Sequence, residues 1–181
     1  MPAASVSLAT VLLAFGSTVR AQEDRERSGF WWSVDAGVGQ VEVSTSRADA
    51  SDTPFYLGFT AGYTISSEFL LGIEFSGWLY EAGNLEDPSK GEGLSQALLM
   101  MRYYPIDNSD FFVRVGGGAV FYSNNAPGAN DSSGWGLSIG GGYDIAAGKR
   151  WSLTPSIAYN YADLDDREVN AITLAVGITW H

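Results

Sequence analysis

Hydrophobic and polar residues alternate with a period of two over most of this chain. The pattern is clearest near the end, where every second residue from Ile172 to Trp180 is apolar and the residues between are small or mildly polar. Successive side chains of a β-strand point to opposite faces, so this alternation predicts a strand with one apolar face over residues 170–181. Six further runs follow the same pattern, over residues 30–43, 55–65, 69–80, 111–122, 135–145 and 151–161. Residues 94–104 form one more run, which is apolar on both faces and whose phase Arg102 fixes only weakly.

Two of these runs contain an irregularity. In the first run the phase shifts near Gln40, where Val41 and Val43 become the apolar positions, and we expect a β-bulge beside Gly39. In the seventh run Pro155 has no N–H to donate, which predicts imperfect pairing at that point.

The connections between the runs alternate in length. Those after the second, fourth and sixth runs are short, whereas residues 44–54, 81–93, 123–133 and 162–168 form longer polar connections. Short turns on one side and long loops on the other are typical of an up-and-down outer-membrane barrel. We therefore expect the four longer connections to face the outside of the cell.

The less apolar face decides between a soluble barrel and a membrane barrel. It carries mostly Gly, Ser, Thr and Ala, and both Lys90 and Lys149 lie in connections. A water-facing surface would carry charged side chains, whereas small residues fit the inside of a narrow cylinder. The bulky face should therefore meet lipid, and the prediction is an all-β, eight-stranded antiparallel up-and-down transmembrane β-barrel.

Aromatic residues gather at the strand ends, as in the girdles of membrane barrels. One predicted girdle, on the periplasmic side, draws on every strand: Trp31, Trp32, Tyr63, Phe69, Tyr103, Phe111, Tyr143, Trp151 and Trp180. The opposite girdle comprises Phe55, Tyr80, Phe121, Trp135 and Tyr161.

The beginning of the chain has the pattern of an export signal. An apolar run over residues 8–15 is followed by Val19-Arg20-Ala21, which predicts a signal peptide over residues 1–21. A mis-called start site upstream of a buried segment is the alternative. We assign residues 22–28 to a short N-terminal segment and residues 29–181 to the barrel domain.

Composition and charge exclude two classes of protein. The chain has 22 Gly, 6 Trp, 9 Tyr and 9 Phe but no Cys, which excludes a small domain held together by disulfides. Its formal net charge of −11 argues against nucleic acid as a partner.

Three stretches resemble the family of small outer-membrane barrels of the OmpA and OmpX type. They are residues 115–119 and 140–143, which are rich in glycine, and residues 159–165 leading into 169–171. The resemblance covers residues 29–181 and implies the outer membrane of a Gram-negative bacterium. It also implies outer-membrane lipid and lipopolysaccharide as partners, and a barrel-assembly machinery that reads a terminal aromatic, here the penultimate Trp180. We expect a monomer.

Four charged residues fall on the predicted inward face: Asp35, Glu74, Arg102 and Arg114. Unpaired charges in a narrow lumen are costly, so we expect the two arginines to pair with the two acids. Two hypotheses remain, an internal ionic plug or an ion gate. Asp144 lies near the periplasmic mouth, where we expect it to be solvated.

The sequence predicts no catalytic, cofactor-binding or metal-binding residues. The only His is His181, and no G-x-S-x-G, H-E-x-x-H or P-loop motif occurs. Acidic residues gather in the connection at 162–168, which is typical of a solvated loop. The expected function is a structural or surface-interaction role, with a narrow channel for ions or small solutes and an outer-membrane lipid-modifying enzyme as alternatives.

Overall fold

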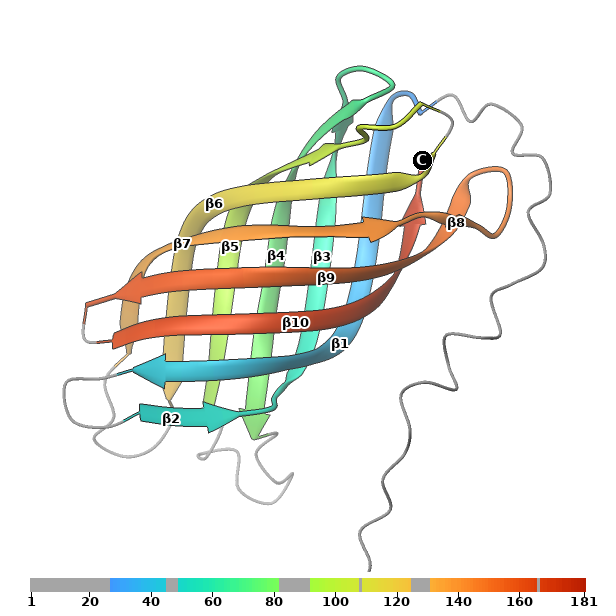
Figure 1. Ribbon diagram of the computed structural model, residues 1–181. Helices are drawn as coiled ribbons and strands as arrows, with labels where there is room; N and C mark the ends of the chain where they lie inside the picture. The colour runs from blue at the N-terminus through green and yellow to red at the C-terminus, as the bar shows by residue number, and fades with distance from the viewer. Residues whose placement is uncertain (1–26, 45–48, 82–91, 108, 125–130, 166) are drawn as a thin grey trace, which may run out of the picture.

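The computed structural model describes residues 27–44, 49–81, 92–107, 109–124, 131–165 and 167–181, which form a closed antiparallel β-barrel (Figure 1). The predicted fold is confirmed, whereas the predicted signal peptide lies outside the described residues. No helix among the described residues has the length and apolarity to cross a membrane. The strands are β1 (Phe30–Ser44), β2 (Asp49–Asp52), β3 (Phe55–Thr64), β4 (Phe69–Glu81), β5 (Glu92–Tyr103), β6 (Phe111–Asn124), β7 (Ser132–Tyr143), β8 (Ile145–Ala146), β9 (Trp151–Leu164) and β10 (Arg167–Trp180).

Ten strands are labelled, but the wall has eight, because β2 is a continuation of β3 and β8 is a continuation of β7. β2 pairs with β1 in the register that β3 sets, with an interruption at Thr53 and Pro54. β8 pairs with β9 in the register of β7, and the break between them stands opposite Pro155. A proline cannot donate to the ladder, so the imperfect pairing predicted at Pro155 is confirmed.

The barrel closes where β1 pairs with β10. The register runs without a break from Trp32 opposite Trp180 to Ser44 opposite Glu168. The predicted β-bulge beside Gly39 is therefore wrong. The register shift that the structure does contain lies between β4 and β5, near Leu79.

The shift of pattern near Gln40 has a different cause, which is a reversal of the environment on the two sides of the wall. Up to Val38, the apolar side chains of β1 other than Trp31 point outward, but Val41 points inward and is 1% exposed. Beyond Val38 the outward positions are polar, including Glu42. The strand keeps its pairing, and the apolar face changes from the outside to the inside.

This reversal marks the part of the wall that extends past the lipid. The 15 residues of β1, at about 3.3 Å each and tilted by about 40°, rise about 38 Å, whereas the apolar band of such barrels is about 25 Å tall. We call the projecting part the rim; it begins after Gln40 on β1 and comprises the residues before Ile172 on β10. The rest of the wall is the membrane zone. The opposite end of the barrel is the turn end, where β10 finishes (Figure 1).

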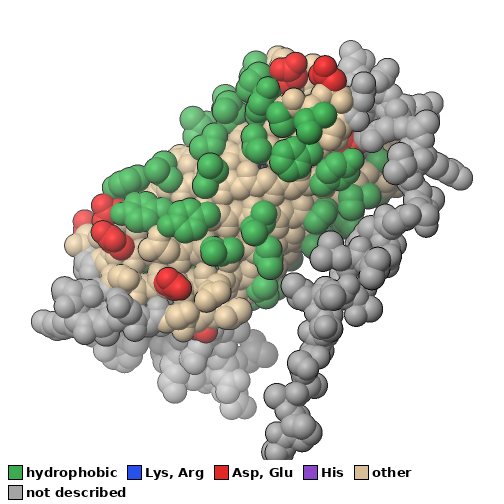
Figure 2. Space-filling model, viewed as in Figure 1, with side chains coloured by type: hydrophobic (Ala, Val, Ile, Leu, Met, Phe, Trp, Pro, Cys, Tyr) green, Lys and Arg blue, Asp and Glu red, His purple; other side chains and the backbone are tan. Residues whose placement is uncertain are grey.

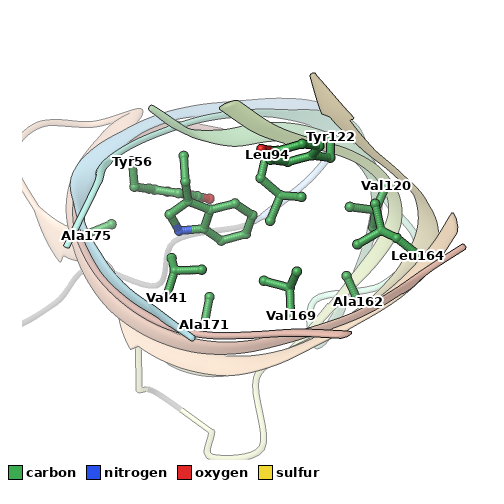
Figure 3. Close-up of a cluster of buried hydrophobic side chains, with 11 residues drawn as sticks. Val41, Tyr56, Leu94, Val120, Tyr122, Ala162, Leu164, Val169, Ala171 and Ala175 are labelled. Atoms are coloured by element: carbon green, nitrogen blue, oxygen red, sulfur yellow. The ribbon is translucent and has the colours of Figure 1, made fainter. Parts of the chain in front are cut away.

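A cluster of buried apolar side chains fills the rim and the adjacent lumen. Figure 3 shows these side chains pointing inward from all around the wall. The cluster comprises Val41, Tyr56, Trp78, Leu94, Val120, Tyr122, Ala162, Leu164, Val169, Ala171 and Ala175.

Because the strands continue into the rim, all four predicted long connections are shorter than expected. β1 and β2 are joined by residues 45–48, and β9 and β10 by residues 165–166. Residues 125–131 join β6 to β7, and residues 82–91 between β4 and β5 remain the longest connection at this end.

The outer wall of the membrane zone carries bulky apolar side chains, and acidic side chains lie toward both ends (Figure 2). At the turn end, Trp32 meets Trp151 edge-on at 5.4 Å between ring centroids, and Phe69 stacks on Tyr103 at 4.6 Å. One predicted girdle residue is misplaced, because Trp31 points into the lumen and is fully buried. Its neighbour Trp32 points outward, because successive side chains of a strand point to opposite faces.

Candidate functional site: the lumen network

The four predicted charges, Asp35, Glu74, Arg102 and Arg114, all lie inside the lumen and are almost fully buried. Two of them form a direct ion pair, in which Arg114 Nη1 lies 2.7 Å from Glu74 Oε2. A buried ion pair is tolerated only where hydrogen bonds satisfy the remaining polar atoms. The surroundings of Glu74 meet this condition.

Glu74 accepts further hydrogen bonds through its second oxygen. Ser76 Oγ donates to Glu74 Oε1 at 2.9 Å, and the Tyr56 hydroxyl donates to the same oxygen at 3.4 Å. Tyr56 reaches Glu74 by lying along its own strand over Gly58. The carboxylate is thus held by groups from β3, β4 and β6.

Hydrogen bonds also cross the lumen, and two of them, Gln96–Asn160 and Trp78–Thr173, join strands that are not neighbours in the wall. Gln96 Nε2 on β5 donates to Ser76 Oγ at 2.9 Å and to Asn160 Oδ1 on β9 at 3.5 Å. Trp78 Nε1 on β4 donates to Thr173 Oγ1 on β10 at 3.1 Å, and Asn160 Nδ2 donates to the same oxygen at 3.4 Å. These contacts close the middle of the lumen from wall to wall.

Sequence reasoning from charges alone missed Gln96, Asn160 and Thr173. All three are polar and lie at inward positions of their strands. Strand parity together with hydrogen-bonding capacity, rather than charge, would have found them.

Arg102 does not pair directly with Asp35, contrary to the predicted pairing. Its Nη2 donates to Ser33 Oγ at 3.1 Å, and Ser33 Oγ donates to Asp35 Oδ2 at 3.1 Å. The guanidinium lies between two rings, 4.6 Å from the centroid of Trp31 and 4.8 Å from that of Phe112. Such aromatic faces stabilise a desolvated cation. The Nε and Nη1 groups of Arg102 have no hydrogen-bond partner among the described residues.

Inward-facing glycines make room for the large side chains of the lumen. A methyl group at Gly39 would lie 2.6 Å from Trp78 Nε1, and one at Gly142 would lie 2.7 Å from the ring of Phe112. The carboxylate of Asp35 lies directly over Gly177. The small residues that predicted a narrow lumen therefore leave space for side chains from facing or neighbouring strands.

Asp144 is buried at the turn end, so the expectation that it is solvated is wrong. It accepts hydrogen bonds of 2.7 Å from the Tyr104 hydroxyl and from Thr154 Oγ1. Nε2 of His181 lies 3.6 Å from the same carboxylate. Asp144 has the same inward parity as Gly142, so its side chain points into the lumen.

Trp180, the predicted assembly signal, lies at the turn end opposite Trp32 and Trp151 in the register of the two neighbouring strands. Its role in recognition stays a prediction. Within the part of the chain that the structure describes, no group of three or more His, Asp or Glu side chains could hold a metal ion.

Comparison with known proteins finds a family and a fold. The model of the outer membrane protein beta-barrel domain family matches residues 8–181. No curated protein sequence matches the chain significantly. Among solved structures, Neisserial surface protein A aligns with a TM-score of 0.59 and 19% identity over 84% of this chain and 97% of its own.

Two other solved barrels align with similar coverage. Ail, the attachment invasion locus protein of Yersinia pestis, solved with the heparin analogue sucrose octasulfate, has a TM-score of 0.51 and 14% identity over 84% of this chain and 99% of its own. OprG from Pseudomonas aeruginosa has a TM-score of 0.49 and 16% identity over 88% of this chain and all of its own. At these identities the likeness concerns the fold.

Proposed function

Because this chain belongs to the outer membrane protein beta-barrel domain family of Gram-negative bacteria, we propose that it is a structural or surface-interaction protein without catalytic activity. The observation that carries the proposal is the closed lumen, in which Gln96–Asn160 and Trp78–Thr173 contacts join opposite walls. Hydrogen bonds that join opposite walls stabilise the shape of the barrel. They also occupy the space through which a solute would have to pass.

The rim supports the surface-interaction part of the proposal. Its interior is apolar and its outer face carries exposed acids such as Glu42, Asp165 and Glu168. A wall with an apolar interior and a polar exterior is stable in water, so the rim forms a rigid platform outside the lipid. Its outer face is available to partners at the cell surface, given that short turns of such barrels face the periplasm.

Planar-bilayer conductance of the refolded protein tests the proposal. We expect no steady unitary currents, because hydrogen bonds of the lumen network cross the middle of the lumen. The control is a bilayer that received the same detergent without protein. Reproducible channels of uniform size from the wild-type chain would contradict the structural role.

A narrow channel for ions or small solutes is the second candidate, and one observation favours it. Buried polar atoms of Arg102, Thr60 and Ser138 lack hydrogen-bond partners among the described residues. Buried polar groups usually bind ordered water, so a thin chain of water in the lumen would satisfy them. If the Arg114–Glu74 pair is a gate, Glu74→Ala opens ion flow in the same bilayers; if it is a plug, the variant stays silent.

A further inference from the structure

A small basic pocket lies at the turn end, outside the lumen network. It has a volume of about 250 Å³ and opens where β1 begins and β10 finishes. The side chains that line it come from the start of β1 and the residues before it, from the end of β10 and His181, and from the turn before β9; they include Arg27, Phe30, Lys149, Arg150, Trp180 and His181.

Two of the cations in this pocket have no ion-pair partner among the described residues. Arg27 already pairs with Asp110 and lies over the ring of Tyr104. By contrast, neither Lys149 nor Arg150 forms an ion pair with any described residue. In a chain with a formal net charge of −11, two adjacent cations without an acidic partner in the described part of the chain are a local exception to the overall charge.

The pocket also contains a buried polar atom without a partner. The side chain of His181 is 7% exposed, and its Nε2 lies 3.6 Å from Asp144. Its Nδ1 has no hydrogen-bond partner among the described residues. Buried polar atoms are rarely left unpaired, so a polar group of a bound molecule would satisfy this atom.

Aromatic residues fix the depth of the pocket in the membrane. Arg150 lies over the ring of Trp180 at 5.6 Å, and Phe30 and Trp180 both line the pocket. Trp151 and Trp32 belong to the same aromatic girdle. Such girdles lie at the level of the lipid headgroups, so the pocket faces the headgroup region rather than open water.

We propose that this pocket binds the phosphate group of a phospholipid in the leaflet at the turn end. A guanidinium presents a planar fork of donors that matches two phosphate oxygens, and an adjacent ammonium adds a point charge. The acyl chains of the lipid follow the apolar wall beside Phe30. The proposal rests on membership of the membrane-barrel family and is independent of the role of the rim.

The position of the pocket gives such a lipid a structural effect. Phe30 belongs to β1, Trp180 to β10, and Arg150 directly precedes β9. A headgroup held among these three elements spans the pair of strands that closes the barrel.

Native mass spectrometry of the full refolded chain in a non-ionic detergent, titrated with dioleoylphosphatidylglycerol, tests the proposal. The test variant is Lys149→Ser combined with Arg150→Ser, which changes exposed turn residues. We expect its affinity for the lipid to fall by about 25-fold, because each basic residue near an anionic lipid surface contributes roughly a fivefold factor. Arg167→Gln, which removes one cation at the rim, is the charge control and should bind as the wild type does.

Two further probes separate phosphate recognition from other causes of binding. Dioleoylglycerol, which has the same chains without the phosphate, should bind much more weakly than phosphatidylglycerol. Inorganic phosphate should also bind more weakly, because it lacks the chains. The proposal is overturned if the double variant retains wild-type affinity, or if dioleoylglycerol binds equally well. Equal affinity for inorganic phosphate would exclude the lipid as the occupant.

Discussion

The membrane zone and the rim use the same alternating strands in opposite ways. In the membrane zone, side chains such as Val34 meet lipid and the lumen holds the Arg114–Glu74 pair. In the rim, Glu42 points outward and Val41 is buried inside. Because β1 pairs continuously with β10 across both regions, the backbone does not decide which face is apolar. The medium that surrounds the wall decides it.

The two interiors should therefore be stabilised by different forces. The lumen of the membrane zone depends on a charged pair and directional hydrogen bonds, which are costly to break singly. The interior of the rim depends on the burial of apolar surface from water, which is roughly proportional to area. Substitutions in each region can separate the two contributions.

The largest effect is expected in the membrane zone for Glu74→Ala. This change leaves the Arg114 guanidinium buried without its carboxylate, and breaking a buried pair from one side costs roughly 3–5 kcal/mol. The urea midpoint of the refolded barrel in detergent should fall accordingly.

Ile73→Ala is the matched control for this prediction. Ile73 precedes Glu74 on β4 but points outward and is half exposed to the lipid side. Lipid chains or detergent can fill the space that the side chain leaves, so the midpoint should change much less. Equal effects of the two substitutions would show that the ion pair adds nothing beyond side-chain volume.

An intermediate effect is expected at the rim for Leu94→Ala. Leu94 is 3% exposed within the apolar cluster. We expect its truncation to cost about 2–3 kcal/mol of the free energy of unfolding, in the lower part of the usual range for a buried leucine. Leu99 on the same strand points outward and is 60% exposed. If Leu99→Ala lowers the urea midpoint as much as Leu94→Ala, the rim has no interior of its own.

The smallest effect is expected where the two regions meet, for Gly39→Ala. The added methyl group would lie 2.6 Å from Trp78 Nε1 and force the indole away from Thr173. Overpacking of this kind typically costs about 1–3 kcal/mol, and we expect about 1–2 kcal/mol because the side chain can move toward the rim. Gly148→Ala, in an open turn, should leave the urea midpoint unchanged.

Strand parity explains how much of this architecture the sequence could predict. Alternation placed seven of the eight wall strands, and strand parity put Asp35, Glu74, Arg102 and Arg114 on the inward face because the parity of a strand is a local property. The rim was missed because the apolar residues of each strand were expected to share one face along its whole length. The inward apolar position of Val41 therefore suggested a bulge. Its actual cause is that the strand has passed beyond the lipid, where the apolar face is the inner one.

The partners of the lumen charges could not be predicted from parity. They depend on which strands face each other across the barrel and on how far each side chain reaches. Arg102 and Asp35 lie on opposite sides of Ser33 in a hydrogen-bonded relay, and no sequence pattern marks Ser33 for that role. Asp144 was likewise misjudged, because its burial depends on Thr154 and Tyr104 from other parts of the chain.

The pairing of the first strand with the last has a consequence for how the protein is made. Contacts between positions far apart in sequence form slowly, because the intervening chain must be ordered before they stabilise it. Until β10 reaches β1, the growing sheet has two unpaired edges, and such edges recruit strands from other molecules. The arrival of β10 removes both edges in one step, so a chain that stalls before its final strand remains prone to aggregation however many strands it has already paired.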